Sequence, residues 1–243
     1  HRGVENTSGP LGQGHTMAVG AAIAERFLAA RFGEWLSHKT YAFISDGGIQ
    51  EEISQGAGRI AGFLGLSNLI MFYDSNDIQL STRTEEVSTE DTAAKYRSWN
   101  WKVSTIDGND PVQIAEALES ALQEKECPTL IIGKTIMGKG ALDESGASFE
   151  GQTSTHGMPL SSAGASFEKT ITGLGGDPAN PFVIFDKVKE AYAAILEEKR
   201  KAAAERRAEQ SAWEKAHPEL AAKYRAFLDG TLPEMDFASI VQK

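Results

Sequence analysis

Short apolar segments alternate with segments of helical periodicity along much of this sequence, and that alternation most constrains how the chain can fold. We predict strands at 41–45, 68–73, 102–106 and 129–134. Helices are expected at 14–32, 49–64, 89–99 and 111–125. Apolar strands that alternate with helices predict an α/β fold, a parallel sheet with helices on both faces.

Three glycines fall inside the helix expected at 49–64. Gly56, Gly58 and Gly62 each lower helix propensity by roughly 1 kcal/mol relative to alanine. A helix that keeps these small residues has a reason to do so, and we expect it to pack closely against another element.

The sequence changes character after the last expected strand. Residues 138–180 are rich in Gly, Ser and Thr and have little periodicity, which indicates a long functional loop with a lid-like role. From Phe182 the apolar residues return at helical spacing, and a further amphipathic helix is expected at 212–230. We therefore divide the chain into an α/β domain, 1–180, and a helical segment with a linker, 181–243.

Two polar side chains come at the carboxyl ends of neighbouring expected strands. Asp46 ends one apolar run and is followed by Gly47 and Gly48, and Asn76 ends the next strand, thirty residues later. Ligands of parallel sheets bind outside these strand ends, and one carboxylate with one amide oxygen suits Mg²⁺ when a diphosphate supplies further oxygens. Glycine backbone and the start of the following helix suit the anion. Asp-Gly turns also occur without ligands, so the prediction depends on the spacing to Asn76.

Composition and charge exclude several classes of function. The net charge of −10 and the pI near 5.1 argue against general nucleic-acid binding, which needs a basic surface. No run of about 18 apolar residues occurs, so we expect no membrane span. A single cysteine, Cys127, fits a reducing compartment, and we expect the cytoplasm.

Several blocks of the sequence resemble segments of transketolases. TSGPLGQG (7–14) is similar to their TTGPLGQG, FYDSNDIQL (72–80) to FYDDNGISI, TSTHGMPL (153–160) to SHGAPL, and WEKAHPEL (213–220) to the linker motif YEKAHPEL. The spacing of Asp46 and Asn76 is also that of the Gly-Asp-Gly and Asn motif of thiamine diphosphate enzymes, with Ser45 in place of the first glycine. The resemblance extends from residue 1 to about 233 and implies the thiamine diphosphate-binding fold.

The resemblance also implies roles for particular residues. Those expected to bind Mg²⁺, or Ca²⁺ in its place, are the side chains of Asp46 and Asn76 and the backbone carbonyl of Ile78. Gly47 and Asn76 would contact the diphosphate. The loop that would contact the rings of the cofactor comprises Gly9, Pro10 and Leu11. His156 would contact both the cofactor and a sugar substrate, as a catalytic residue, because an imidazole can exchange protons near neutral pH.

The resemblance implies a transferase of the pentose phosphate pathway that moves a two-carbon ketol unit between sugar phosphates. Such enzymes are homodimers and use a pyrimidine-binding domain and a C-terminal domain that this sequence lacks, so we expect a fragment that is inactive alone. A dihydroxyacetone synthase, a two-chain relative of transketolase, or a non-catalytic binding or assembly module remain alternatives. The GPLGQG block argues against a deoxyxylulose-phosphate synthase.

Overall fold

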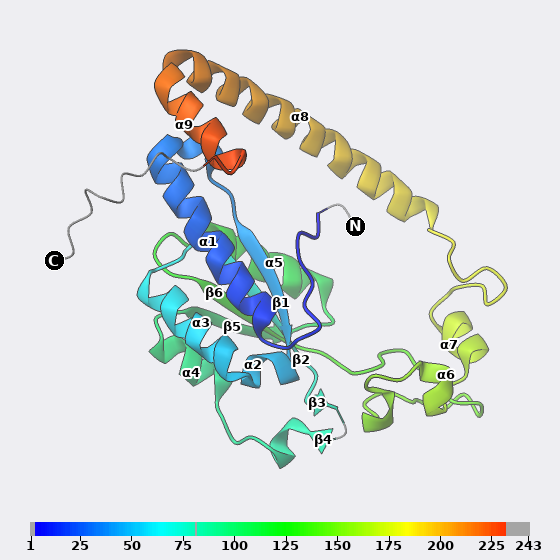
Figure 1. Cartoon of the computed structure of the whole chain (residues 1–243). Coiled ribbons are helices and arrows are strands. Elements are labelled where there is room, and N and C mark those ends of the chain that lie inside the picture. Colours follow the sequence, from blue (N-terminus) through cyan, green and yellow to red (C-terminus); the bar gives the residue numbers. More distant parts are fainter. Residues whose placement is uncertain (1–2, 81, 232–243) are drawn as a thin grey trace. The chain divides into compact units, whose positions relative to one another are not determined.

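The computed structural model describes residues 3–80 and 82–231, which form two compact units (Figure 1). Of the described residues, 3–24, 38–80 and 82–183 form the first unit, and 25–37 and 184–231 form the second. The helix α1 (Gln13–Phe32) contributes to both units. None of the helices within the described residues is long and apolar enough to cross a membrane.

The first unit is built on a four-stranded parallel sheet, as the sequence predicts (Figure 1). The strand order is β1 (Thr40–Ser45), β2 (Leu69–Ser75), β6 (Thr129–Lys134), β5 (Lys102–Asp107). All neighbouring pairs are parallel. After β2, the short strands β3 (Ile78–Gln79) and β4 (Thr82–Arg83) form an antiparallel pair. Two short helices follow, η2 (Thr84–Glu86) and α4 (Thr92–Ser98).

Helices cover both faces of the sheet, because successive strand residues point to opposite sides. On one face Met71 and Tyr73 belong to a core that includes Ala22 of α1 and Ala61 of α3 (Glu52–Phe63). On the other face the core forms around Ile70, Ile131, and two alanines of α5 (Pro111–Gln123), Ala117 and Ala121. The predicted fold class is therefore confirmed.

One part of the second face is open. Strand β1 lies at the end of the strand order, and its Tyr41 and Phe43 are 54% and 83% exposed. The Phe43 ring contacts Phe72 of the next strand, with centroids 5.9 Å apart. These rings leave an apolar surface on the outer part of the sheet.

The helix expected at 49–64 is wrong in one respect, because the structure divides it in two. The helix α2 (Asp46–Gln50) begins directly at the strand end, and α3 (Glu52–Phe63) follows after a break at Glu51. Glu51 is extended, with φ −62° and ψ 134°, and the Ser54 hydroxyl donates to the Gly48 carbonyl across the break at 2.7 Å. A five-residue helix has a weak dipole, so the expected help to an anion comes mainly from backbone N–H groups.

The glycines of α3 pack closely at two of three positions. A Cβ atom on Gly62 would lie 1.7 Å from the backbone oxygen of Trp99, and one on Gly58 would lie 3.2 Å from the Trp99 ring. A Cβ atom on Gly56 would have no neighbour within 4 Å. The helix therefore packs closely against Trp99, as expected, through Gly58 and Gly62 and not through Gly56.

The long functional loop expected at 138–180 contains short helices that the sequence analysis did not predict. This region folds into η3 (Thr153–Thr155), α6 (Leu160–Ala163) and α7 (Phe167–Gly173), joined by antiparallel bridges between Leu142 and Ser148 and between Asp143 and Ala165. Helices this short show no detectable periodicity in a sequence, which explains the difference.

The second unit consists of helices held together by aromatic side chains. It contains the end of α1, η1 (Glu34–Leu36), α8 (Asp186–Ala216) and α9 (Pro218–Leu228). Phe32 contacts Tyr224 with ring centroids 5.3 Å apart, and Trp35 contacts Trp213 at 5.5 Å. The helix expected at 212–230 is wrong in its start, because the chain breaks at His217, before Pro218, whose ring cannot continue the preceding helix.

Candidate functional site

Asp46 lies at the carboxyl end of β1 and is 1% exposed. Its two carboxylate oxygens have separate donors. The Tyr73 hydroxyl donates to Oδ1 at 2.6 Å, and the backbone N–H of Asn76 donates to Oδ2 at 3.1 Å. Each carboxylate oxygen keeps a lone pair, because a carboxylate offers about four acceptor positions. The structure therefore brings Asp46 and Asn76 together at adjoining strand ends.

Burial controls the electrostatics of Asp46. Loss of solvation raises the pKa of the Asp46 carboxyl, while the hydrogen bonds from Tyr73 and from the Asn76 amide act in the opposite direction. Burial, together with the hydrogen bond to Asp46, also raises the pKa of Tyr73, so this residue stays a neutral donor. A cation at this carboxylate would relieve the cost of burying its charge.

Asn76 and Ile78 form the next part of the site. The Asn76 side-chain oxygen accepts a hydrogen bond from the Ile78 N–H at 3.1 Å, which fixes the amide orientation. An amide oxygen has a second lone pair that can face a ligand. Ile78 itself is buried and begins β3, which pairs with β4 in antiparallel register.

Sequence reasoning missed a set of polar side chains beside this site. The Lys134 ammonium, at the end of β6, donates to the Ser75 hydroxyl at 3.0 Å and to Asp77 Oδ1 at 2.7 Å. These residues and Tyr73 line a hollow of about 270 Å³. The available signal was that each follows or ends a strand, but their pairing depends on the register of β2 against β6, which places Ser75 opposite Lys134.

The loop of Gly9, Pro10 and Leu11 lies against the start of α2. A Cβ atom on Gly47 would lie 3.3 Å from Leu11 Cδ1, so the loop and the predicted diphosphate contact are neighbours. Gly9 has open space around its Cα, and all three loop residues are exposed. The backbone there is accessible to a flat ring.

His156 follows η3 and is half-buried. Its Nδ1 atom is buried and has no hydrogen-bond partner within the described part of the chain. A buried ring nitrogen without a partner is costly unless a ligand or water satisfies it. No contact described for His156 joins it to Asp46 or Asn76, so its place in the site stays a prediction.

The donor set at the strand ends fits Mg²⁺ better than a soft transition metal. No cluster of three or more His, Cys, Asp or Glu side chains that could hold a metal occurs in residues 3–80 and 82–231. The atoms present are one carboxylate, one amide oxygen and backbone carbonyls, and Mg²⁺ favours few protein oxygens together with phosphate oxygens and water. The residues therefore fit the predicted metal-bound diphosphate.

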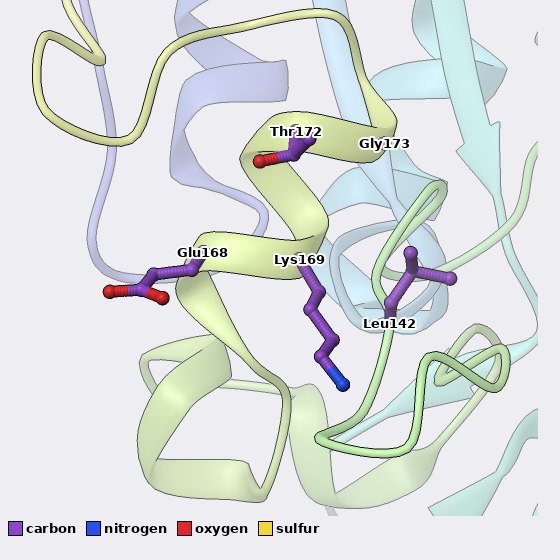
Figure 2. A pocket seen from close by; sticks show the side chains of 5 residues that line it. All are labelled: Leu142, Glu168, Lys169, Thr172 and Gly173. Atoms are coloured by element: carbon purple, nitrogen blue, oxygen red, sulfur yellow. The ribbon is translucent and has the colours of Figure 1, made fainter.

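A larger hollow of about 430 Å³ lies away from these residues. Leu142, Glu168, Lys169, Thr172 and Gly173 line it (Figure 2). The Glu168 and Lys169 side chains leave α7 in different directions and do not converge on a common point (Figure 2). We place the candidate site at the strand ends, where buried polar atoms converge.

The fold and the paired oxygens at the strand ends define the class of α/β cofactor-binding domains whose ligand lies at the carboxyl edge of a parallel sheet. The sequence matches the family described as "Transketolase, thiamine diphosphate binding domain" over residues 1–233. The chain belongs to this transketolase family, and the resemblance stated above is confirmed.

Curated relatives and solved structures support the same assignment. The chain is 40% identical to transketolase 2 of Xanthobacter flavus over 238 residues, which cover 95% of this chain and 33% of the relative. It is 39% identical to transketolase 2 of Escherichia coli K12, covering 99% of this chain and 35% of the relative. A crystal structure of a Pichia stipitis transketolase aligns with a TM-score of 0.86 and 33% identity, over 96% of this chain and 34% of that one. The chain thus spans about a third of the length of the proteins it matches.

Proposed function

We propose that this chain holds the diphosphate end of thiamine diphosphate through Mg²⁺. The ligands would be the side-chain oxygens of Asp46 and Asn76 and the carbonyl of Ile78, and Ca²⁺ could use the same oxygens. The observation that carries the proposal is the 3.1 Å hydrogen bond from the Asn76 N–H to Asp46 Oδ2. It joins the backbone of Asn76 to the buried carboxylate at the adjoining strand end, which supports a site shared by the two residues.

The other predicted residues would bind and orient the rest of the cofactor. Gly47 would donate its N–H to the diphosphate, and the closeness of Leu11 to Gly47 supports a shared site with the loop at Gly9 and Pro10. His156 would accept or donate a proton at a sugar hydroxyl, and its unpartnered Nδ1 supports a ligand contact. The thiazolium ring, when bound, supplies an electron sink for cleavage beside a carbonyl.

The complete protein would transfer a two-carbon ketol unit from a ketose phosphate to an aldose phosphate, as in the pentose phosphate pathway. Solved Pichia stipitis transketolases in complex with xylulose 5-phosphate and with sedoheptulose 7-phosphate support this substrate class. The chain spans about a third of its relatives, so we expect it to need a pyrimidine-binding domain and a C-terminal domain. Product formed from xylulose 5-phosphate and ribose 5-phosphate by the purified chain alone would contradict this expectation.

Calorimetric titration tests the binding proposal. Thiamine diphosphate should bind in the presence of Mg²⁺, and a chelator should abolish the heat, whereas NAD should give none. Asn76→Ala should weaken binding at least tenfold, since it removes a metal ligand. Asn109→Ala is the matched control, because Asn109 lies beyond the end of β5 and should leave the affinity unchanged. Equal binding of thiamine diphosphate with Mg²⁺ and with the chelator would refute the proposal.

We also propose that the chain forms a homodimer. An exposed apolar stripe on α3 supports this, with Ile53, Ile60 and Phe63 on one helical face and open space at Gly56. Sedimentation of Phe63→Ser, compared with Phe167→Ser on α7, should show loss of the dimer in the first variant alone. A cytoplasmic location is supported by the single free cysteine, Cys127.

A further inference from the structure

Asp77 has an unusual backbone for its residue type. Its φ is +62°, in the left-handed region, where among the described residues the other non-glycine is Asn100. Side chains with a Cβ atom adopt this region reluctantly, and aspartate tolerates it better than most. The string FYDDNGISI, to which residues 72–80 are similar, has glycine at this position. The turn therefore has a conformation that glycine would adopt freely and that aspartate needs support to keep.

Lys134 supplies that support. Its ammonium donates to Asp77 Oδ1 at 2.7 Å and to the hydroxyl of Ser75, which is buried, at 3.0 Å. Lys134 thus binds the residues on both sides of Asn76. The parallel register places Lys134 directly beside Ser75, so the ammonium reaches Asp77 from a fixed strand end.

The backbone around Asp77 carries the hydrogen bonds of the candidate metal site. The Asn76 N–H donates to Asp46, the Ile78 N–H donates to the Asn76 side chain, and the Thr84 N–H donates to the Asp77 carbonyl at 3.0 Å. A change of φ at Asp77 would turn the peptide groups on either side of it. The Ile78 N–H and the Asp77 carbonyl belong to these peptide groups, so the second and third of these bonds would then lose their geometry.

We propose that Asp77 and Lys134 are positioning residues, whose ion pair holds the left-handed turn and thereby keeps the Asn76 side chain in the orientation that the Ile78 N–H fixes. The inference rests on the proposed function only where it concerns metal and cofactor. The conformation of the turn belongs to the chain itself and can be measured without either. If the ion pair opposes backbone strain, Lys134 should matter while residue 77 is aspartate and should lose its effect once that residue is glycine.

Hydrogen exchange in the presence of a chelator tests the turn directly. Lys134→Met should speed exchange of the Ile78 and Thr84 amides by about fivefold, the upper range for a half-exposed ion pair. Asp77→Gly should exchange close to wild type, Asp77→Ala at least about threefold faster than Asp77→Gly, and Lys134→Met should add less than about twofold in the Asp77→Gly background. Lys102→Met is the matched control, because Lys102 pairs with Glu124 at 3.6 Å, at the start of β5.

Cofactor binding gives the second measurement. With Mg²⁺ present, the dissociation constant of thiamine diphosphate should rise about fivefold in Lys134→Met and stay within twofold of the Asp77→Gly value in the double variant. Equal exchange at Ile78 and Thr84 in every variant overturns the positioning role, whatever the cofactor does. A wild-type chain that binds no thiamine diphosphate contradicts the proposed function, and the exchange rates then decide the positioning role alone.

Discussion

Replacing Tyr73 with phenylalanine would remove a single hydroxyl from the centre of the candidate site. That hydroxyl donates a 2.6 Å hydrogen bond to Asp46 Oδ1, and both side chains are buried. Phenylalanine keeps the ring and its packing in the core on that face of the sheet. The substitution therefore removes the hydrogen bond to a buried carboxylate, together with the hydrogen bond between the hydroxyl and Ser75.

The structure sets the size of the effect. A hydrogen bond to a charged group contributes about 1.5–3 kcal/mol, so we expect the free energy of unfolding of the metal-free chain to fall by about 2 kcal/mol at pH 7.5. A hydrogen-bond partner of a metal ligand affects metal affinity by 10- to 100-fold in typical cases, and we expect about tenfold weaker Mg²⁺-dependent binding of thiamine diphosphate.

The effect should depend on pH, with a definite sign. Burial already raises the pKa of Asp46, and the Tyr73 hydrogen bond lowers it, so the variant should have a still higher Asp46 pKa. When the folded-state pKa of a carboxyl is raised, the free energy of unfolding of the protein falls as pH rises through that pKa. The difference between variant and wild type should therefore be largest above the Asp46 pKa and should shrink toward acid pH, where the carboxyl is protonated in both.

Urea unfolding and calorimetry, each with Tyr96→Phe as the control, provide the assay. Tyr96 is 0% exposed, and its hydroxyl has no hydrogen-bond partner in the described part of the chain. Loss of that hydroxyl should change stability by less than about 0.5 kcal/mol, or increase it, because no bond is broken. If the two variants lose equal stability, or if Tyr73→Phe keeps wild-type affinity, the hydrogen bond does not have the role assigned to it.

Three further predictions concern other positions. Gly62→Ala should lower the free energy of unfolding by about 3 kcal/mol, because its Cβ would lie 1.7 Å from the Trp99 carbonyl oxygen. Gly56→Ala should raise the free energy of unfolding by about 0.5–1 kcal/mol. Equal free energies for the two variants in urea unfolding would contradict the packing of α3. Asp46→Asn should stabilise the metal-free chain at pH 8, where it removes a buried charge. In calorimetry the same variant should lose the Mg²⁺-dependent binding of thiamine diphosphate. If that binding is retained, Asp46 is not a metal ligand. Burial lowers the pKa of His15 from 6.5 to about 4, so the free energy of unfolding should fall by about 2 kcal/mol between pH 7.5 and pH 5.0. His15→Leu should remove that fall. If the free energy of unfolding of the variant changes with pH as in the wild type, His15 is not the source.

The sheet could be predicted from sequence because its strands are nearly continuous apolar runs. Residues such as Ile70 and Ile131 are buried on a face that a helix covers. Strands covered on both faces are apolar at successive positions, and such short apolar runs could be assigned as strands. The break at Glu51 was not predictable in the same way. It depends on the Ser54 hydroxyl reaching the Gly48 carbonyl, a contact that no helix propensity describes.

In the candidate site, too, some residues could be predicted from the sequence and others could not. Asp46 and Asn76 could be found because each ends a strand, and parallel strands bring their carboxyl ends to one edge. Lys134 and Asp77 could not be paired, since their contact requires the register of β2 against β6 and a left-handed backbone at an aspartate. Sequence patterns report which face or end a residue occupies, and they do not report which side chains meet there.

The open outer face of β1 has a consequence for the chain in solution. β1 lies at the end of the strand order and has the exposed rings of Tyr41 and Phe43, and an edge strand of this kind can pair with a strand from another molecule. The net charge of −10 opposes such encounters at low ionic strength, and added salt screens that repulsion. Turbidity should accordingly develop sooner in concentrated, salty buffers than in dilute ones, and lysine at position 43 should delay it.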